Sequence, residues 1–567
     1  ILPVPQGYSL SVVSHVFLAA AGAYGLARFG LGVGRLAALT AALLFAFGGF
    51  TSGLVTHLNQ LQGVAWSPWL FMLLMVALYL VANLFRLLRN LLALLRGAPP
   101  DYVVLDVAGA YPERRAPRPR FLPLRGALPF LQPPSQESLE ELRGVLARVA
   151  AAPHVRGVVV RIGELTGGLA TVQGLRDALL ALRRRGKRVV AYLTTITSPQ
   201  YYLAAAADEI LLPESAVVGL TGLRTEVTFL REAFDRLGIA PEFDRIAEYK
   251  TAADRFLRRS MSPEHREMVD AILDSQLDQI IEDIAASRRL EREVVRTAID
   301  RAPFSAAEAL AMGLVDGVLF EDELPRRLGS PEREAVLQPW PQARRRLPAP
   351  YRWPSLQDAV AVGTLRGTIG PGESREFPVP LPLFGRQTAG SSTLARAFRA
   401  VERAPRVRAV VFSVDSGGGS ALASDLIWRE VERVKRRKPV VAFMGDVAGS
   451  GGYYVACGAN RIIAQPGTIT GSIGVVSGKL VVADLVERHG LHREILSRGA
   501  AATIDSPFVR YGETEWARVR QEMQQIYDRF IGRVSQGRAR PAAEIEAIAR
   551  GRVWTGADAL SHGLVDE

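Results

Sequence analysis

The chain of 567 residues has few of the residues that build metal and disulfide sites. It contains one cysteine, Cys457, so no disulfide can form within the chain and no thiolate metal site can be assembled. The seven histidines are scattered, and none forms a helical pair of ligands with a nearby carboxylate. We therefore expect no metal and no organic cofactor.

Aromatic residues make up only 8% of the chain, and no aromatic stacking motif accompanies its basic charge. The net charge is +12 and the isoelectric point is about 10. Nucleic-acid binding is one interpretation of this charge. A solvated, arginine-rich surface near anionic lipid is the other, and the missing aromatic motif favours it. We expect no nucleic-acid partner.

Apolar residues are concentrated in the first hundred positions, and they raise the mean hydropathy of the whole chain to +0.11. Three apolar runs cover residues 12–27, 36–47 and 64–85, and the last is long enough to cross a bilayer of roughly 30 Å. The sequence predicts a hydrophobic membrane segment over residues 1–98, with one span and at most three. Arg86, Arg89 and Arg96 follow the last run and would favour a cytoplasmic side for the rest of the chain.

Residues 1–70 stand apart from the rest of the chain. Residues 48–50 (Gly-Gly-Phe) and 65–69 (Ala-Trp-Ser-Pro-Trp) resemble part of a polytopic bacterial membrane protein of the YfhO-like type. This resemblance suggests a fused or foreign segment, and we draw no catalytic inference from it.

The remainder contains an internal duplication. Residues 200–210 (Gln-Tyr-Tyr-Leu-Ala-Ala-Ala-Ala-Asp-Glu-Ile) parallel residues 452–462, and residues 307–316 parallel residues 557–566, with an offset near 250. We predict two copies of one domain, over residues 99–335 and 358–567, joined by a linker at residues 336–357 that is rich in proline and arginine. Each copy alternates β-branched runs with helical patterns, which predicts an α/β fold with a parallel sheet.

Three glycine-rich segments of the second copy are candidates for chemistry. Residues 415–420 (Asp-Ser-Gly-Gly-Gly-Ser) follow an apolar strand, where successive glycines let backbone N–H groups converge on an anion. Residues 449–454 (Gly-Ser-Gly-Gly-Tyr-Tyr) lie between a strand and a helix, and residues 470–474 (Thr-Gly-Ser-Ile-Gly) form a tight turn. Taken alone, each segment is also typical of a flexible turn, with Ser450 doing no more than capping a helix.

Together the three segments resemble the signal peptide peptidase A (protease IV) family of serine peptidases, which shares its fold with the caseinolytic protease and the crotonases. That family carries Asn-Ser-Pro-Gly-Gly-Ser, Ala-Ser-Gly-Gly-Tyr-Tyr and Thr-Gly-Ser-Ile-Gly. The resemblance covers residues 70–567 and implies two tandem caseinolytic-protease-like (crotonase-like) domains. Asp415 replaces the family's asparagine, and we expect its side chain to point away from the oxyanion.

The resemblance also implies the roles of site residues. The nucleophile maps to Ser450, and the general base maps to Lys250, within residues 248–253 (Glu-Tyr-Lys-Thr-Ala-Ala) of the first copy. Ser472 maps to a serine near the lysine amine, and the N–H groups of Gly418 and Gly451 map to the oxyanion donors. Burial in an apolar cleft would lower the pKa of Lys250 and leave its amine neutral, whereas an exposed Lys250 would pair with Asp254 one turn away.

The duplication separates the two halves of this site. Alignment of the copies places Ser450 opposite Ser198, which lacks the following Gly-Gly, and Lys250 opposite Ala502. We therefore expect one composite site per chain, with the base from the first copy and the nucleophile from the second.

The resemblance finally implies a membrane-bound serine endopeptidase that degrades cleaved signal peptides. Its expected partners are peptide substrates, membrane lipid and further copies of the chain, up to a tetramer. Its expected location is a bacterial cell membrane, with the catalytic domains on the periplasmic side. The alternatives are an acyl-CoA enzyme of the crotonase class, which would need a catalytic glutamate pair, and an inactive membrane scaffold.

Overall fold

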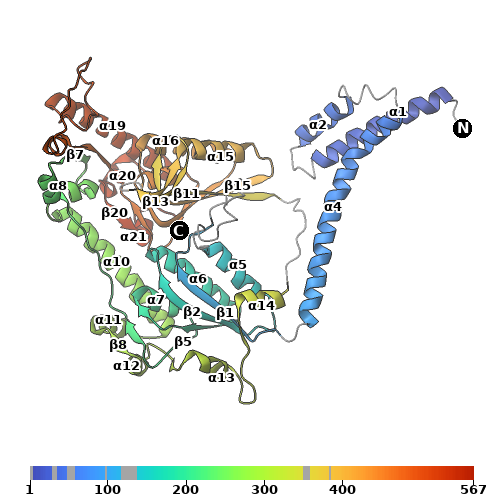
Figure 1. The fold of residues 1–567 in the computed structure, drawn as a ribbon, viewed down its shortest axis with the longest axis horizontal. Coiled ribbons are helices and arrows are strands. Elements are labelled where there is room, and N and C mark those ends of the chain that lie inside the picture. Colours follow the sequence, from blue (N-terminus) through green and yellow to red (C-terminus); the bar gives the residue numbers. More distant parts are fainter. Residues whose placement is uncertain are drawn as a thin grey trace.

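The computed structural model describes residues 4–27, 35–47, 58–95, 99–115, 137–348, 358–381 and 385–567. Three helices at the N-terminus form an arm beside two α/β units (Figure 1). The first unit lies below the second in this view, and the green helix α10 runs along one side of both.

The N-terminal arm consists of α1 (Val4–Gly25), α2 (Arg35–Phe47) and α4 (Leu58–Leu95), and α1 packs against both of the others. Twelve large apolar side chains between Leu70 and Leu91 on α4 are 46–68% exposed. Within the described ranges, no helix meets the combined requirements of length and apolarity for crossing a bilayer. The span predicted within residues 64–85 is therefore not confirmed.

The first unit is built on a six-stranded parallel sheet with strand order β10-β1-β2-β3-β5-β9. β-branched residues fill β2, where Val158, Val159 and Val160 are all fully buried. One face of the sheet packs against α5, α6 and α7, and the other packs under the segment around α13. The strands of this sheet are β1 (Tyr102–Gly109), β2 (Gly157–Leu165), β3 (Arg188–Tyr192), β5 (Glu209–Leu212), β9 (Gly317–Val318) and β10 (Leu337–Pro339).

The second unit repeats this plan with strand order β11-β15-β16-β18-β20, and β17 also pairs with β16. Its strands run parallel except for the final pair, β18 with β20. The strands of this sheet are β11 (Ala359–Arg366), β15 (Val407–Ser416), β16 (Val440–Gly449), β17 (Arg461–Ala464), β18 (Ile469–Gly471) and β20 (Val553–Thr555).

Helices and short strands complete the two units. In the first unit these are α5 (Leu139–Ala150), α6 (Leu169–Arg184), β4 (Ile196–Thr197), α7 (Ser198–Ala204), β6 (Val217–Gly219), α8 (Arg231–Leu237), β7 (Ala240–Ile246), α9 (Asp254–Leu257), α10 (Pro263–Arg288), α11 (Arg292–Arg301), β8 (Phe304–Ser305), α12 (Ala306–Ala311), α13 (Leu324–Leu328) and α14 (Trp340–Arg346). In the second they are β12 (Thr368–Gly370), β13 (Arg375–Leu381), β14 (Gly385–Gly390), α15 (Ser391–Arg403), α16 (Ala421–Lys435), α17 (Gly451–Ala456), β19 (Val475–Val481), α18 (Ala483–Arg488), α19 (Glu513–Arg538), α20 (Ala542–Ile548) and α21 (Gly556–Ser561).

The α/β class and the duplication are thus confirmed. From Gly219 to Phe256 the first copy aligns without a gap to residues 471–508 of the second, at a constant offset of 252. The helices follow this alignment, since α8 starts at Arg231 and α18 at Ala483. The domain boundaries remain predictions, and part of the expected linker has regular structure, because β10 joins the first sheet and α14 follows it.

The two copies are joined by a pair of strands, one from each copy. β7 of the first copy pairs antiparallel with β19 of the second, from Ile246 opposite Val475 to Ala240 opposite Val481. Helix α19 packs against both strands, and α10 packs against β20. In Figure 1 the green β7 and α8 accordingly lie beside the second unit, far from the sheet of their own copy. Because of this pairing, the residues that follow β7 lie against the second unit.

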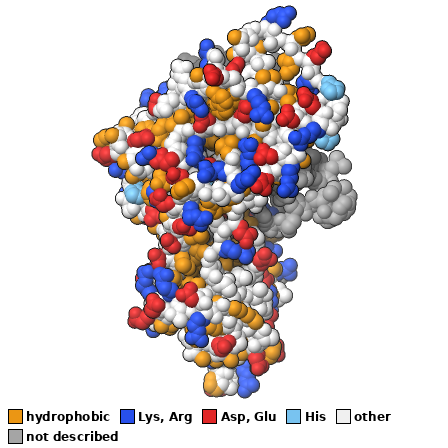
Figure 2. All heavy atoms as spheres, turned by 90° about the vertical axis from the view of Figure 1, so that its left-hand side faces the viewer, with side chains coloured by type: hydrophobic (Ala, Val, Ile, Leu, Met, Phe, Trp, Pro, Cys, Tyr) orange, Lys and Arg blue, Asp and Glu red, His pale blue; other side chains and the backbone are white. Residues whose placement is uncertain are grey.

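The face that carries these elements shows both signs of charge. In Figure 2, blue Lys and Arg side chains alternate with red Asp and Glu side chains over the surface turned to the viewer. The excess of basic residues therefore forms no single-sign field on this face.

Candidate active site

Ser450 lies at the junction between β16 and α17. Its backbone has φ 53° and ψ −120°, a conformation that is costly for a residue with a side chain. Its N–H donates to the carbonyl oxygen of Gly471 at 2.8 Å, which fixes the junction to β18. A sharp strand-to-helix turn of this kind presents a serine hydroxyl at the N-terminus of a helix.

The glycine loop after β15 packs directly against this junction. A Cβ atom on Gly418 would lie 2.6 Å from the backbone N of Gly451 and 2.8 Å from Cβ of Ser450. A Cβ atom on Gly452 would lie 2.4 Å from the carbonyl oxygen of Ser416. Glycine is therefore required on both sides of the contact.

The loop does not present the N–H group that the sequence suggested. The N–H of Gly418 donates to Oγ of Ser416 at 3.1 Å, which occupies it. Ile369 bonds to both neighbours of Gly419, donating to the carbonyl of Gly418 and accepting from the N–H of Ser420, each at 2.9 Å. The N–H of Gly419 therefore points away from Ile369, and among the described residues it has no acceptor.

Lys250 follows β7, and the pairing of β7 with β19 places it beside Ser450. Its side chain is 5% exposed, although it belongs to the first copy and Ser450 to the second. Its Nζ lies 2.9 Å from Oγ of Ser450, 2.9 Å from Oγ of Ser472 and 2.7 Å from the carbonyl oxygen of Ser472. The structure thus brings together the three side chains that the sequence selected from distant segments.

Three oxygen atoms lie within hydrogen-bond reach of Nζ, which suits both an ammonium with three N–H donors and a neutral amine. A neutral lysine has two N–H donors and one lone pair. The two donors match the two oxygens of Ser472, and the lone pair is left to accept the hydroxyl proton of Ser450. Burial lowers the pKa of Lys250 from its ordinary value to about 7, so that much of the amine is neutral near pH 7.

The alternative partner of Lys250 is engaged elsewhere. Asp254 is 2% exposed and accepts a hydrogen bond from Nη1 of Arg245 at 2.7 Å. Lys250 forms no ion pair in the part of the chain that the structure describes. Asp254 therefore does not hold the amine in its charged form.

Residues 550–552 form a bracket that holds Lys250 and Ser472 in place. The carbonyl of Arg550 accepts from the N–H of Tyr249 at 3.1 Å, and the carbonyl of Arg552 accepts from the N–H of Ser472 at 2.7 Å. Between them Gly551 has φ 82°, and a Cβ atom on it would lie 2.4 Å from the backbone N of Lys250. The sequence analysis did not predict this bracket. The one sequence feature that could have indicated it is Gly551, which comes just before β20.

Among the described residues, no lysine amine bonds to Ser198, the counterpart of Ser450 in the first copy. Oγ of Ser198 donates to the carbonyl oxygen of Gly222 at 3.1 Å, at the start of α7. Ala502, which corresponds to Lys250, has no amine.

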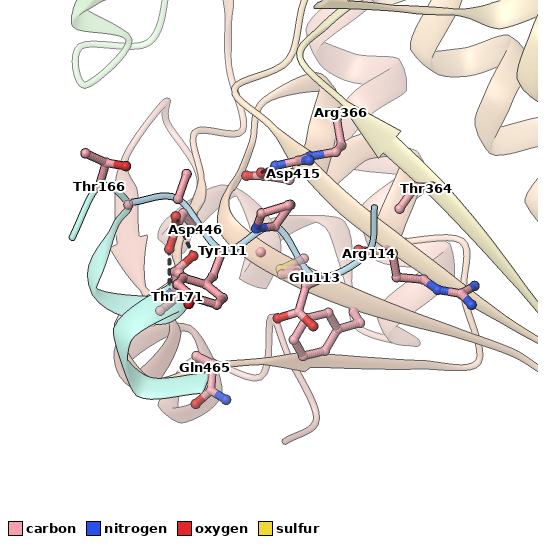
Figure 3. A pocket seen from close by; sticks show the side chains of 18 residues that line it. Tyr111, Glu113, Arg114, Thr166, Thr171, Thr364, Arg366, Asp415, Asp446 and Gln465 are labelled. Atoms are coloured by element: carbon pink, nitrogen blue, oxygen red, sulfur yellow. Dashed lines mark hydrogen bonds and ion pairs between the residues drawn. The ribbon is translucent and has the colours of Figure 1, made fainter. Parts of the chain in front are cut away.

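A separate pocket of about 200 Å³ lies between the two units (Figure 3). The Asp446 carboxylate accepts from the N–H groups of Gly168 and Thr171 and from the Thr171 hydroxyl, and so caps α6 of the first unit. Asp415 points into this pocket and lies 3.5 Å from Arg366. Burial raises the pKa of Asp415. Neither Gly418 nor Ser450 lines the pocket, so the Asp415 side chain faces away from Ser450.

No set of three histidine, cysteine or acidic side chains in the described residues has the geometry to hold a metal ion.

Comparison with protein families matches the peptidase family S49 over residues 181–333 and 432–567, one segment in each copy. The chain belongs to peptidase family S49. Membership in this family of serine peptidases agrees with the resemblance drawn from the three glycine-rich segments.

Three relatives extend this finding. The chain is 34% identical over 442 residues to "Serine protease SPPA, chloroplastic" of Arabidopsis thaliana, which covers 76% of this chain and 63% of that protein. It is 30% identical over 433 residues to "Protease 4" of Haemophilus influenzae, covering 73% and 68%. It is 30% identical over 186 residues to "Putative signal peptide peptidase SppA" of Enterococcus faecium, covering 33% and 54%. The chain thus spans under two thirds of the chloroplast protein.

The bracket predicts the effect of a single methyl group. Gly551→Ala forces a Cβ atom into the Lys250 backbone, so we expect kcat for peptide cleavage to fall at least about 100-fold with KM little changed. Gly186→Ala is the matched control, because Gly186 has φ 76° and open space around its Cβ position. Steady-state kinetics and circular dichroism of both variants check this. Equal activity in the two variants would show that the bracket is not needed to position Lys250.

Proposed function

We propose that this chain is a serine endopeptidase in which Ser450 is the nucleophile and Lys250 is the general base. The observation that carries the proposal is the 2.9 Å contact between Lys250 Nζ and Ser450 Oγ in a buried site. Family membership supports the reaction class.

The proposed reaction follows from the hydrogen bonds of the amine. Neutral Lys250 accepts the Ser450 proton while Oγ bonds to the scissile carbonyl carbon. The ammonium then donates this proton to the departing peptide amine as the C–N bond breaks, which leaves an acyl-enzyme. Water attacks the acyl carbon with Lys250 again acting as base, and Ser450 is released. Ser472 holds the amine in line throughout.

We assign the oxyanion donors to Gly419 and Gly451 and withdraw Gly418. The N–H of Gly451 is the first of α17, where no intrahelical acceptor exists. A Cβ atom on Gly451 would lie 3.3 Å from the N of Gly419, so the two donors are neighbours. Two convergent N–H groups beside a nucleophile stabilise a tetrahedral oxyanion.

Substrates are proposed to be cleaved signal peptides, as the name of the Enterococcus faecium relative suggests. We place the chain at a bacterial cell membrane with its catalytic units on the periplasmic side, and we propose self-association up to a tetramer. The acyl-CoA alternative is less favoured, because the group that contacts the Ser450 hydroxyl is the Lys250 amine and not a carboxylate. An inactive scaffold gives no reason for burying Lys250 against Ser450.

Removal of either dyad member tests the proposal. We expect Ser450→Ala and Lys250→Met each to lower casein or signal-peptide cleavage by at least about 1000-fold. Ser198→Ala is the matched control and keeps full activity, since its hydroxyl bonds to a carbonyl oxygen outside the site. Full activity in Ser450→Ala or Lys250→Met would refute the dyad.

The depressed pKa of Lys250 predicts the pH dependence. The protonated amine cannot act as a base, so kcat/KM rises with pH and reaches half its maximum near pH 7. A profile measured from pH 5 to 10 with a neutral peptide ester checks this. A rise centred near the ordinary lysine value of about 10.4 would contradict a buried, neutral base.

The exposed apolar side chains of α4 predict binding to lipid. We expect the full chain to float with vesicles of phosphatidylethanolamine and phosphatidylglycerol, because water-exposed leucines gain about 25 cal/mol per Å² on burial. Leu73→Asp, Leu80→Asp and Leu84→Asp together should reduce flotation, whereas Leu310→Asp, at an exposed site on α12, should not. Unchanged flotation in the triple variant would exclude this face as the lipid contact.

A further inference from the structure

The start of helix α6 in the first unit holds a carboxylate that belongs to the second unit. Asp446 accepts hydrogen bonds from the N–H groups of Gly168 and Thr171 at 2.8 and 2.7 Å, and from the Thr171 hydroxyl at 2.8 Å. The dashed lines of Figure 3 mark the bonds to Thr171. N–H groups in the first turn of a helix favour a negative charge. The charge of Asp446 is therefore stabilised across the boundary between the two units.

The loop that makes these bonds is the counterpart of the glycine loop beside the nucleophile. The starts of α6 and α16 differ by the offset of 252, so residues 166–168 correspond to residues 418–420. In the second copy this loop lies against Ser450, and in the first copy it holds the Asp446 carboxylate. A loop whose backbone suits an anion is thus kept in both copies, and in the first copy it serves the contact between the units.

Asp446 lies close to the nucleophile along the chain. It stands four residues before Ser450, and both belong to the segment of β16 and its junction with α17. Between them, Ala448 faces Thr470 of β18 on one side and Ser416 of β15 on the other. A strand that is paired on both sides has little freedom to bend. The position of Asp446 therefore constrains the position of Ser450.

The same helix also contacts the segment that leads to Ser472. Oε1 of Gln173 on α6 accepts a hydrogen bond from the N–H of Gly467 at 2.7 Å. This segment is in turn bonded to β16, because Oγ1 of Thr470 donates to the carbonyl oxygen of Ala448 at 2.8 Å. Helix α6 thus contacts both of the second-unit segments that lead into the site.

We propose that Asp446 is a positioning residue for the nucleophile, and that its hydrogen bonds to the start of α6 set the place of Ser450 relative to Lys250. Lys250 belongs to the first copy and Ser450 to the second, so the 2.9 Å contact between them requires one fixed arrangement of the two units. The pairing of β7 with β19 is one link between the copies, and Asp446 provides another on the strand of the nucleophile. This role rests on the Ser450–Lys250 dyad proposed above.

A purely structural role of Asp446 makes a different prediction. A carboxylate that only joins the two units would affect thermal stability, and each folded molecule of a variant would remain as active as wild type. A positioning residue instead changes the rate at which Ser450 itself reacts. The rate of Ser450 phosphonylation, measured on folded protein well below its Tm, separates the two roles.

Asp446→Asn tests the positioning role with little change of shape. Both carboxylate oxygens accept from N–H groups, so the amide nitrogen of asparagine would bring a donor against a donor. We expect kcat for peptide cleavage and the rate of Ser450 phosphonylation to fall about 30-fold, with KM within about 2-fold of wild type. The pH midpoint near 7 should stay in place, because the surroundings of the Lys250 amine are unchanged. Asp208→Asn is the matched control and keeps kcat, since Asp208 accepts from the N–H of Val189 at 2.8 Å within the first unit.

Thr171 gives a second test that leaves the second unit untouched. Thr171→Ala removes the hydroxyl donor to Asp446 and should lower both rates about 5-fold, whereas Thr171→Ser keeps a hydroxyl and should restore them. Wild-type rates in Asp446→Asn or in Thr171→Ala would overturn the proposal, and so would a loss that serine does not restore. Full activity in Ser450→Ala refutes the dyad and this role together. Unchanged phosphonylation in Asp446→Asn, with wild type labelled on Ser450, overturns only the role of Asp446.

Discussion

The antiparallel pairing of β7 with β19 is the contact on which the site depends. This pairing holds the end of β7 against the second unit and so places Lys250, which belongs to the first copy, beside Ser450 of the second. Seven consecutive residue pairs align the two strands, and the constraint they impose extends directly to the turn that carries Lys250. The contact between Lys250 and Ser450 thus depends on backbone hydrogen bonds between two copies of one domain.

Burial turns this placement into chemistry. The bracket at residues 550–552 and the turn at residues 472–474 lie against Lys250, which is buried, and this burial disfavours the charged form of the amine. Arg245 pairs with the nearby Asp254 and removes the carboxylate that would otherwise favour an ammonium. The same close packing requires glycine at positions 418, 452 and 551, where a methyl group would meet backbone atoms.

Much of this could be predicted from the sequence. The duplication, the α/β class and the partnership of Lys250 with Ser450 followed from repeated motifs and from the family resemblance. The choice between Gly418 and Gly419 did not, because it depends on a local hydrogen bond to Oγ of Ser416. The bracket and the Asp446 cap on α6 were also out of reach, since each joins segments far apart in the chain and neither leaves a periodic pattern. The sequence analysis predicted a linker where β10 and α14 lie, because the proline and arginine content of residues 338–346 is typical of a loop.

The central claim is that each chain holds one competent site, assembled from both copies. A serine-directed phosphonate, followed by intact-mass and peptide-mass analysis, tests it most directly. The account predicts one adduct per chain, on Ser450, and none when Lys250 is replaced by methionine. An adduct on Ser198, or undiminished labelling of Ser450 without the lysine amine, would contradict it.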